Sequence, residues 1–407
     1  MAEIHHNFKG VIDTTLRDGQ QSPLMFDTYT YRFGLEDKIK IVDGLLELGV
    51  QSIEFFSPIV STSEGNDFSE LRDRIRSKNP SIRLLAHCRT HPTDIEMALD
   101  AGFDGLNLYM GVSPEAQHHS HGLAIPEIAL RVRDTIESIR SAHPDLYIRF
   151  SGEDCFRTDL QDIYRVYDGI ADVVDTFGMP DTVGIATPDL VRKRVLALKK
   201  RYPNVDLECH FHNDRGYALI NSVTAVFSGA SYIDTSVWGL AERSGITSVT
   251  GLLFNLFQDN PDLCNTYNLK VCYPLNVLMA TILGMQVPYT EPVSLTNRTH
   301  TAGVHTKAVI HNAGVYEAMD LARFGVTTNQ LLLGPLSGWN LIYYYLKEIK
   351  GFELSKEQAQ QISTEFKSQS ESISRKLSPE KVLMEVIAPY QLAQFPIEDS
   401  LGRIENL

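Results

Sequence analysis

The chain has 407 residues, 43% of them hydrophobic and 22% charged, which is the composition of a globular protein. That length accommodates a domain of about 250 residues with an appended region. The formal net charge of −14 argues against nucleic acid as a partner, because an acidic surface repels a phosphate backbone. The N-terminus is polar and no run of about 18 apolar residues occurs, so we expect a cytoplasmic protein without a signal peptide or membrane span.

The five cysteines form no C-x-x-C pair, and their odd number argues against a disulfide framework. We expect free, mostly buried thiols in a reducing compartment.

Short β-rich runs alternate with helical patterns eight times before residue 260. This alternation predicts a parallel sheet, and eight repeats predict a closed (β/α)8 TIM barrel of the α/β class. A doubly wound sheet would show the same alternation. The expected strands are 11–15, 51–57, 82–88, 105–110, 146–151, 182–186, 205–210 and 232–237. The later helices are expected at 126–142, 159–177, 188–201, 218–230 and 247–258.

The alternation stops after about residue 259, which divides the chain into three expected parts. Residues 1–259 form the catalytic barrel, and 260–325 form a linker subdomain of loops and short helices. Residues 326–407 form a mostly helical C-terminal subdomain, which is too short for a second large domain.

Polar and ionisable residues follow the apolar strands at the positions where the strands end. In a TIM barrel this end carries the active site, whereas a purely structural barrel has no need of such residues. The sequence therefore favours an enzyme. The residues delivered there include Arg17, Asp18, Gln21, Glu54, His87, Arg149, Ser151, Glu153, Thr182, His210 and His212.

His210 and His212 are two residues apart at the end of the seventh strand. Side chains at i and i+2 of a strand point to the same side, so both imidazoles can reach one ion. Asp18, at the end of the first strand, would complete a set of two histidines and one carboxylate that leaves positions open for substrate. An isolated His-x-His pair also occurs by chance, but the carboxylate at the same end of the barrel favours a metal.

Arg17 and Arg149 also stand at strand ends. Guanidinium groups bind carboxylates with two parallel hydrogen bonds, so the pair suggests a substrate with at least two anionic groups. Salt bridges to Glu54 or Glu153 are the structural alternative, and both roles can coexist.

Two other segments carry weaker signals. The histidine-rich stretch 118–122 lacks a neighbouring carboxylate or cysteine, so we interpret it as a solvated or substrate-covering loop rather than a metal site. The glycine-punctuated stretch 238–245 has no G-x-G-x-x-G pattern, so its indication of phosphate binding is weak.

Several motifs of the chain together resemble those of a known enzyme family. D-T-T-L-R-D-G-Q-Q-S-P at 13–23 and H-F-H-N-D at 210–214 are similar to the metal-dependent TIM-barrel acyltransferases that include homocitrate, isopropylmalate and citramalate synthases. R-F-S-G-E-D at 149–154 and E-R-S-G-I-T at 242–247 are most similar to the homocitrate synthase branch. The resemblance covers about residues 10–350 and is highly specific.

The resemblance implies a role for each candidate residue. Asp18, His210 and His212 would bind a divalent Mg, Mn or Zn ion, and Arg17 would polarise the ketone of a 2-oxo acid. Glu153 would act as acid or base. His305 and Tyr316 are similar to catalytic residues that the partner subunit of a homodimer inserts into the site. The residues expected to bind substrate are Arg17, Gln21, Glu54, His87, Arg149, Ser151 and Thr182.

The implied reaction is a Claisen-type condensation of acetyl-CoA with a 2-oxo acid, followed by hydrolysis of the thioester. 2-Oxoglutarate, which gives homocitrate, is the expected acceptor. Departures from the family pattern near the pocket include Asp18 instead of Glu, Asn107 instead of an acidic residue, Pro180 instead of a small residue and a longer, tyrosine-rich segment at 24–34. They leave oxaloacetate, phosphonopyruvate and 2-oxoisovalerate open as acceptors.

The same barrel could serve three other functions, and the sequence disfavours each of them. A hydroxymethylglutaryl-CoA lyase would carry a reactive cysteine after the eighth strand, where this chain has G-L-A-E-R-S-G-I at 239–246. A carboxyltransferase is disfavoured because no biotin-carrier region is visible. A regulator without activity would have lost motif residues that are all present here.

Overall fold

The computed structural model describes residues 7–371 and 378–395, and the chain divides into two compact units, 1–292 and 293–407. The sequence placed its boundaries at 259 and 325, and residues 372–377 and 396–407 of the expected helical region lie outside the described residues. The first unit extends past 259 because helix α11 (Cys272–Leu283) packs on helix α2 (Leu35–Leu48). Gly44 of α2 leaves the space that Leu275 of α11 fills.

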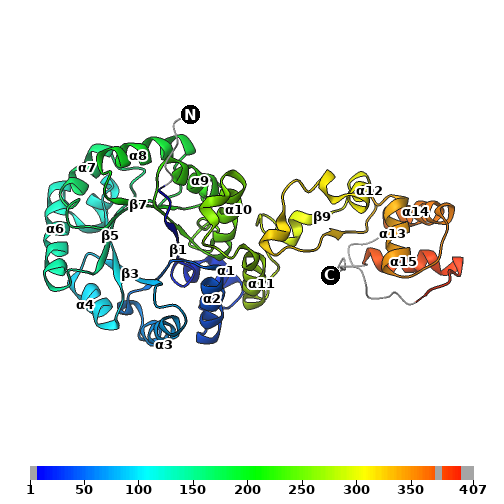
Figure 1. Ribbon diagram of the computed structural model, residues 1–407, viewed down its shortest axis with the longest axis horizontal. Coiled ribbons are helices and arrows are strands. Elements are labelled where there is room, and N and C mark those ends of the chain that lie inside the picture. The colour runs from blue at the N-terminus through cyan, green and yellow to red at the C-terminus, as the bar shows by residue number, and fades with distance from the viewer. Residues whose placement is uncertain (1–6, 372–377, 396–407) are drawn as a thin grey trace. The chain divides into compact units, whose positions relative to one another are not determined.

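The first unit is a closed barrel of eight parallel strands in the order β1 to β8, so the predicted TIM barrel is confirmed (Figure 1). Each strand pairs with its sequence neighbours, and β8 closes the barrel against β1 over Gly10–Asp13. The other strands are β2 (Ser52–Phe56), β3 (Arg83–Arg89), β4 (Gly105–Gly111), β5 (Tyr147–Glu153), β6 (Thr176–Asp181), β7 (Asp206–Phe211) and β8 (Tyr232–Thr235).

Helices surround the barrel, and each turns an apolar stripe toward the strands. In α2 the buried residues Ile41, Val42, Leu45 and Leu48 form that stripe, and Gly49 ends the helix with a left-handed φ of 93°. The other helices of this layer are α3 (Thr62–Lys78), α4 (Pro92–Ala101), α6 (Ile125–Ala142), α7 (Leu160–Asp168), α8 (Pro188–Arg201), α9 (Ala218–Ser228) and α10 (Val249–Asp259).

The sixth strand was predicted in the wrong place. The structure puts β6 at Thr176–Asp181 instead of 182–186, and helix α7 ends at Asp168, well before 177. Gly178 and Pro180 lower the strand propensity of the true strand, although Phe177 and Met179 are fully buried. Residues 182–186 instead form a turn, in which the Asp181 carboxylate accepts the backbone N–H groups of residues 185 and 186.

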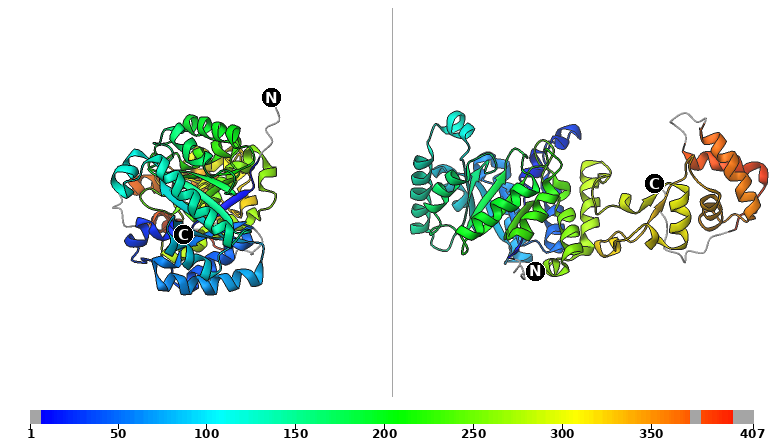
Figure 2. Two further views of the ribbon diagram at one scale, coloured as in Figure 1. Left: turned by 90° about the vertical axis from the view of Figure 1, so that its left-hand side faces the viewer. Right: turned by 90° about the horizontal axis from the view of Figure 1, so that it is seen from above.

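The two ends of the barrel differ in chemistry. Ile12, Leu85 and Tyr232 form an apolar cluster inside the barrel, with Tyr147, the first residue of β5, packed against it. The carboxyl ends of the strands carry the polar side chains instead. In the right-hand view of Figure 2, the segments after β1 (blue) and β4 (cyan) project from one end of the barrel.

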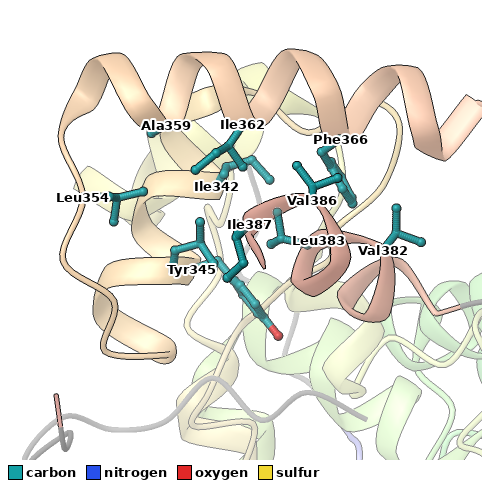
Figure 3. Close-up of a cluster of buried hydrophobic side chains, with 11 residues drawn as sticks. Ile342, Tyr345, Leu354, Ala359, Ile362, Phe366, Val382, Leu383, Val386 and Ile387 are labelled. Carbon is teal, nitrogen blue, oxygen red and sulfur yellow. The ribbon is translucent and has the colours of Figure 1, made fainter. Parts of the chain in front are cut away.

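The second unit contains the short paired strands β9 (Thr299–His300) and β10 (Gln330–Leu331) and several helices. These helices are α12 (Gly303–His311), α13 (Trp339–Tyr344), α14 (Lys356–Glu371) and α15 (Pro379–Ile387). Figure 3 shows the apolar cluster that packs α13, α14 and α15 together, in which Ile342, Ile362, Phe366 and Leu383 are fully buried. Among the described residues, no helix is long and apolar enough to cross a membrane.

Candidate active site

The chain turns sharply where β1 ends, and Asp13 organises this turn. Its carboxylate oxygens accept hydrogen bonds from the Thr15 backbone N–H at 2.9 Å and from the Thr15 hydroxyl at 3.0 Å. Such side-chain to backbone bonds stabilise a turn two residues ahead. Burial, the largest effect, raises the pKa of Asp13 to about 7. The turn leads into the short helix η1 (Asp18–Gln21) and leaves Arg17 and Asp18 buried beside the mouth of the barrel.

Glu54, from β2, connects the two candidate arginines at the centre of the barrel. Its Oε1 accepts Arg17 Nε at 2.9 Å, and its Oε2 accepts Arg149 Nη2 at 2.6 Å. Burial alone would raise the pKa of Glu54, but the charges of Arg149 and Arg17 outweigh it and hold that pKa well below the ordinary value. Glu54 is therefore an ionised carboxylate that fixes both guanidinium groups.

Arg149 is enclosed by carboxylates from three strands. Besides Glu54, its Nη1 contacts Asp234 Oδ1 at 2.9 Å and lies 3.6 Å from Glu208 Oε2. Its Nε is buried and has no hydrogen-bond partner among the described residues. Salt bridges therefore hold most of the Arg149 guanidinium, as the structural alternative predicts, and one N–H group remains without a protein partner.

Sequence reasoning missed Glu208 and Asp234, both 1% exposed. Burial, followed by the charge of Asp234, raises the pKa of Glu208 well above its ordinary value, which favours the protonated form of this group. A signal was available, because each residue interrupts an apolar strand with a charge. Glu208 also lies two positions before His210 and so points to the same side of β7.

The three predicted metal ligands lie at the carboxyl ends of β1 and β7, the two strands that flank β8. The His210 and His212 rings are 5.0 Å apart, and His210 Nδ1 lies 4.0 Å from Asp18 Oδ2. His210 Nδ1 contacts Asp234 Oδ2 at 3.2 Å, an arrangement that orients a ligating imidazole and fixes its tautomer. Within the described residues, no three His, Cys, Asp or Glu side chains already stand around one point.

The donor chemistry nevertheless fits a divalent ion. His212 Nδ1 is buried without a hydrogen-bond partner in the described part of the chain, so this imidazole is free to bind another group. Burial, then the neighbouring His210, lowers the pKa of His212 to about 3, and the neutral form is the one that ligates. Two imidazoles and one carboxylate match the preferences of Zn²⁺ and related ions.

His87 lies on the opposite wall of the barrel with Asn107 and Ser151. The His87 ring stacks on Tyr109, with 4.3 Å between the ring centroids. Asn107 Nδ2 lies 3.0 Å from His87 Nδ1, and Asn107 Oδ1 accepts the Ser151 hydroxyl at 3.0 Å. The two predicted substrate-binding residues are therefore connected through an asparagine that the sequence marked only as a departure from the family.

Glu153 and Thr182 stand nearer the surface than the arginines. Burial, then the charge of Asp154, raises the pKa of Glu153 above its ordinary value, which suits a group that exchanges protons. The Thr182 hydroxyl accepts the Asp154 backbone N–H at 2.8 Å, so Thr182 reaches the strand ends although its strand was misplaced. Gln21, at the end of η1, is exposed.

These residues surround a cavity that opens outward. An inner pocket of about 100 Å³ adjoins an outer cleft of about 450 Å³. The residues that line both cavities include Arg17, His87, Glu153, Thr182 and His212. Arg149, Ser151 and His210 face only the inner pocket, whereas Asp18 and Gln21 face only the cleft. Glu54 lines neither cavity and lies behind the two arginines. This position suits a role in holding the arginines better than it suits direct contact with a substrate.

The remaining predicted residues, His305 and Tyr316, belong to the second unit. Their rings stack with 3.9 Å between centroids, and each lies 6.4 Å from the ring of His300. Glu317 accepts Arg298 Nε at 2.7 Å and contacts His300 Nε2 at 3.1 Å, which fixes the segment that carries Tyr316. The structure thus brings this histidine and tyrosine together.

The two weaker sequence signals acquire structural explanations. In the histidine-rich stretch, His121 Nε2 contacts the Gly111 carbonyl at 2.9 Å, which folds the segment back on the end of β4. In the stretch 238–245, a Cβ on Gly245 would lie 2.3 Å from the Gly239 carbonyl oxygen, so glycine is required for close packing of the backbone.

Comparison with known proteins identifies both units. The HMGL-like family model matches residues 10–273, and the homocitrate synthase post-HMGL domain-like model matches residues 293–374. The cytosolic homocitrate synthase isozyme of Saccharomyces cerevisiae is 34% identical over 365 residues, which cover 89% of this chain and 82% of the yeast protein. The mitochondrial homocitrate synthase of Yarrowia lipolytica is 36% identical, over 82% of this chain and 72% of its own length.

Among solved structures, the hydroxymethylglutaryl-CoA lyase of Pseudomonas aeruginosa superimposes with a TM-score of 0.57 at 20% identity. The match covers 69% of this chain and 96% of the lyase. At that identity the similarity shows the barrel fold alone.

Proposed function

Because the chain belongs to the HMGL-like family and to its homocitrate synthase branch, we propose that it condenses acetyl-CoA with 2-oxoglutarate to give homocitrate and CoA. The observation that carries this proposal is that both units match, since the second unit matches the domain that follows the barrel in homocitrate synthases. The enzyme is an acyltransferase of the condensing type.

The inner pocket supplies the groups that a dianionic 2-oxo acid requires. Arg149 offers its unpartnered Nε to a carboxylate, and Ser151, His87 and Thr182 line the same wall. Gln21 and Glu54 complete the proposed substrate-binding set, Gln21 from the cleft and Glu54 by holding the arginines. Asp18, His210 and His212 would hold a divalent Mg, Mn or Zn ion, which supplies Lewis acidity toward the ketone when bound.

The proposed reaction begins with removal of a proton from the acetyl-CoA methyl group. The resulting carbanion forms a C–C bond to the ketone carbon, and the ketone oxygen becomes an alkoxide that takes up a proton. Arg17 stabilises this developing charge from its place beside the pocket. Water then cleaves the thioester, which releases CoA and homocitrate and makes the sequence irreversible.

We assign the proton transfers to Glu153 and to a histidine–tyrosine pair. Glu153 lines both the pocket and the cleft. The family resemblance supports a homodimer in which His305 of the partner subunit acts as the base, and Tyr316 of the partner subunit assists. We also propose the cytoplasm as the compartment, which is that of the cytosolic isozyme of Saccharomyces cerevisiae.

The test is CoA release, followed with a thiol reagent, from metal-loaded protein with acetyl-CoA and a panel of acceptors. The panel contains 2-oxoglutarate, oxaloacetate, phosphonopyruvate, 2-oxoisovalerate and pyruvate. Fastest turnover with 2-oxoglutarate is the expected result. Preference for another acceptor would contradict the substrate, and CoA release with none of them would contradict the reaction.

A further inference from the structure

Asn107 lies at the centre of the substrate pocket and is 2% exposed. Its amide nitrogen lies 2.9 Å from Glu54 Oε2 and 3.0 Å from His87 Nδ1, and its amide oxygen accepts the Ser151 hydroxyl. No motif of the sequence assigned this residue a role. Its three partners are all residues proposed to bind substrate.

The hydrogen-bonding capacity of Glu54 fixes the orientation of this amide. Glu54 is ionised, so it only accepts hydrogen bonds, and the Asn107 atom beside it must be the NH₂ group. A carboxylate has about four lone-pair sites. Arg17 occupies Oε1 through Nε at 2.9 Å and Nη2 at 2.6 Å, while Arg149 and Asn107 occupy Oε2 at 2.6 and 2.9 Å.

The saturation of Glu54 decides which nitrogen of His87 carries the proton. His87 Nδ1 lies 3.4 Å from Glu54 Oε1, but that oxygen already accepts two N–H groups of Arg17. The second N–H of Asn107 points at the same Nδ1, so a proton on Nδ1 would face another donor. Nδ1 is therefore the acceptor. Burial, followed by the charge of Arg17, also lowers the pKa of His87, which favours the neutral ring.

We propose that Asn107 holds His87 as the neutral Nε2–H tautomer, so that His87 presents a hydrogen-bond donor to the distal carboxylate of the 2-oxo acid. Asn107 is thus a positioning residue that contributes to acceptor specificity through His87. The substrate part of this inference rests on the proposed function, whereas the tautomer does not.

The geometry of His87 supports this assignment. Its ring lines both the inner pocket and the outer cleft, and Nε2 makes no hydrogen bond within residues 7–371 and 378–395. Stacking on Tyr109 restricts rotation of the ring. A fixed N–H that faces the cavity favours an anionic acceptor group over the methyl groups of 2-oxoisovalerate, which cannot accept a hydrogen bond.

The first experiment is ¹⁵N NMR of the histidine side chains in the full-length wild-type protein, with the His87 signal assigned by its loss in His87→Gln. His121 is an internal reference, because its Nδ1 accepts the Leu123 backbone N–H at 3.1 Å and its Nε2 contacts the Gly111 carbonyl. Both histidines should show the Nε2–H pattern. An Nδ1–H pattern for His87 in the wild-type protein would overturn the proposal, and this result needs no folded variant.

The second experiment uses Asn107→Leu, which keeps the approximate size of the side chain and removes the N–H that faces His87 Nδ1. Nothing then holds the Nε2–H tautomer, and Glu54 has a free acceptor site, so the signal of His87 should change toward Nδ1–H while that of His121 does not. The KM for 2-oxoglutarate should rise about tenfold, the value of one hydrogen bond to a charged group, with less than about a twofold rise for 2-oxoisovalerate.

The outcomes separate the two claims. Equal changes in KM for both acceptors, or none, would overturn the role in specificity. Absence of turnover by the wild-type protein with every acceptor would contradict the proposed function and leave the tautomer result standing.

Discussion

The two units of this protein bury different kinds of side chain. The barrel holds Glu54, Arg149, Glu208 and Asp234 at its centre, each 1% exposed or less. The second unit buries apolar side chains in two clusters, the larger of them within residues 342–387 with Ile362 and Phe366 as members. The barrel partners come from separate strands, so Arg149 and Asp234 are 85 positions apart in the sequence. The difference shows that the centre of the first unit is held by buried ion pairs and the core of the second by apolar packing.

The largest expected effect comes from the metal-binding end of the barrel. His210→Ala should lower kcat by at least about a thousandfold, because metal-assisted stabilisation of an oxyanion contributes several kcal/mol. Turnover and bound metal are measured together. His143→Ala is the matched control, since His143 is exposed at the end of α6. Turnover by the His210 variant without bound metal would contradict the proposed role of the metal in this site.

The next effect compares a buried ion pair with an exposed one. Glu54→Gln should lower the free energy of unfolding of the barrel by about 3–5 kcal/mol, because it removes the buried charge that two buried guanidinium groups share. Asp168→Asn breaks an exposed pair with Arg201 and should cost less than about 1 kcal/mol. Urea unfolding measures both variants, and equal costs would contradict the structural role of Glu54.

A smaller effect is expected in the apolar core of the second unit. Ile362→Val removes one buried methylene and should cost about 0.5–1.5 kcal/mol. Ile220→Val in the barrel unit is the matched control, because Ile220 is 48% exposed and should change stability little. Limited proteolysis with mass spectrometry locates the unfolding. Faster cleavage in the barrel than in residues 293–371 would contradict a separate core.

The smallest effect concerns the surface of the second unit. A hydrogen bond from Lys350 lowers the pKa of Glu380, so the ionised pair stabilises the fold above the ordinary carboxyl pKa and loses this effect as the pH falls through the folded value. Glu380→Gln should therefore lower Tm slightly at pH 7 and not at about pH 3. The opposite dependence on pH would show that the pair is not formed.

The barrel was predictable because parallel strands and amphipathic helices leave periodic patterns in the sequence. The pattern failed at β6, where Gly178 and Pro180 conceal a buried strand. The site was predictable at strand ends, where Arg17, His87, His210 and His212 converge on one cavity. Glu54 was predicted as a salt-bridge partner of the arginines, but the pairing of Arg149 with Asp234 was not, because it depends on strand register in three dimensions. The positioning role proposed for Asn107 could not be predicted either, because it depends on the strands that place Glu54 and His87 beside it.

The most direct test of the central claim is mass spectrometry of the product formed from acetyl-CoA and 2-oxoglutarate by the metal-loaded protein, with CoA release recorded in the same reaction. The proposed function predicts homocitrate and CoA in equal amounts. CoA release without homocitrate would contradict the condensation, and the absence of both products would contradict the assignment of 2-oxoglutarate to the pocket around Arg149.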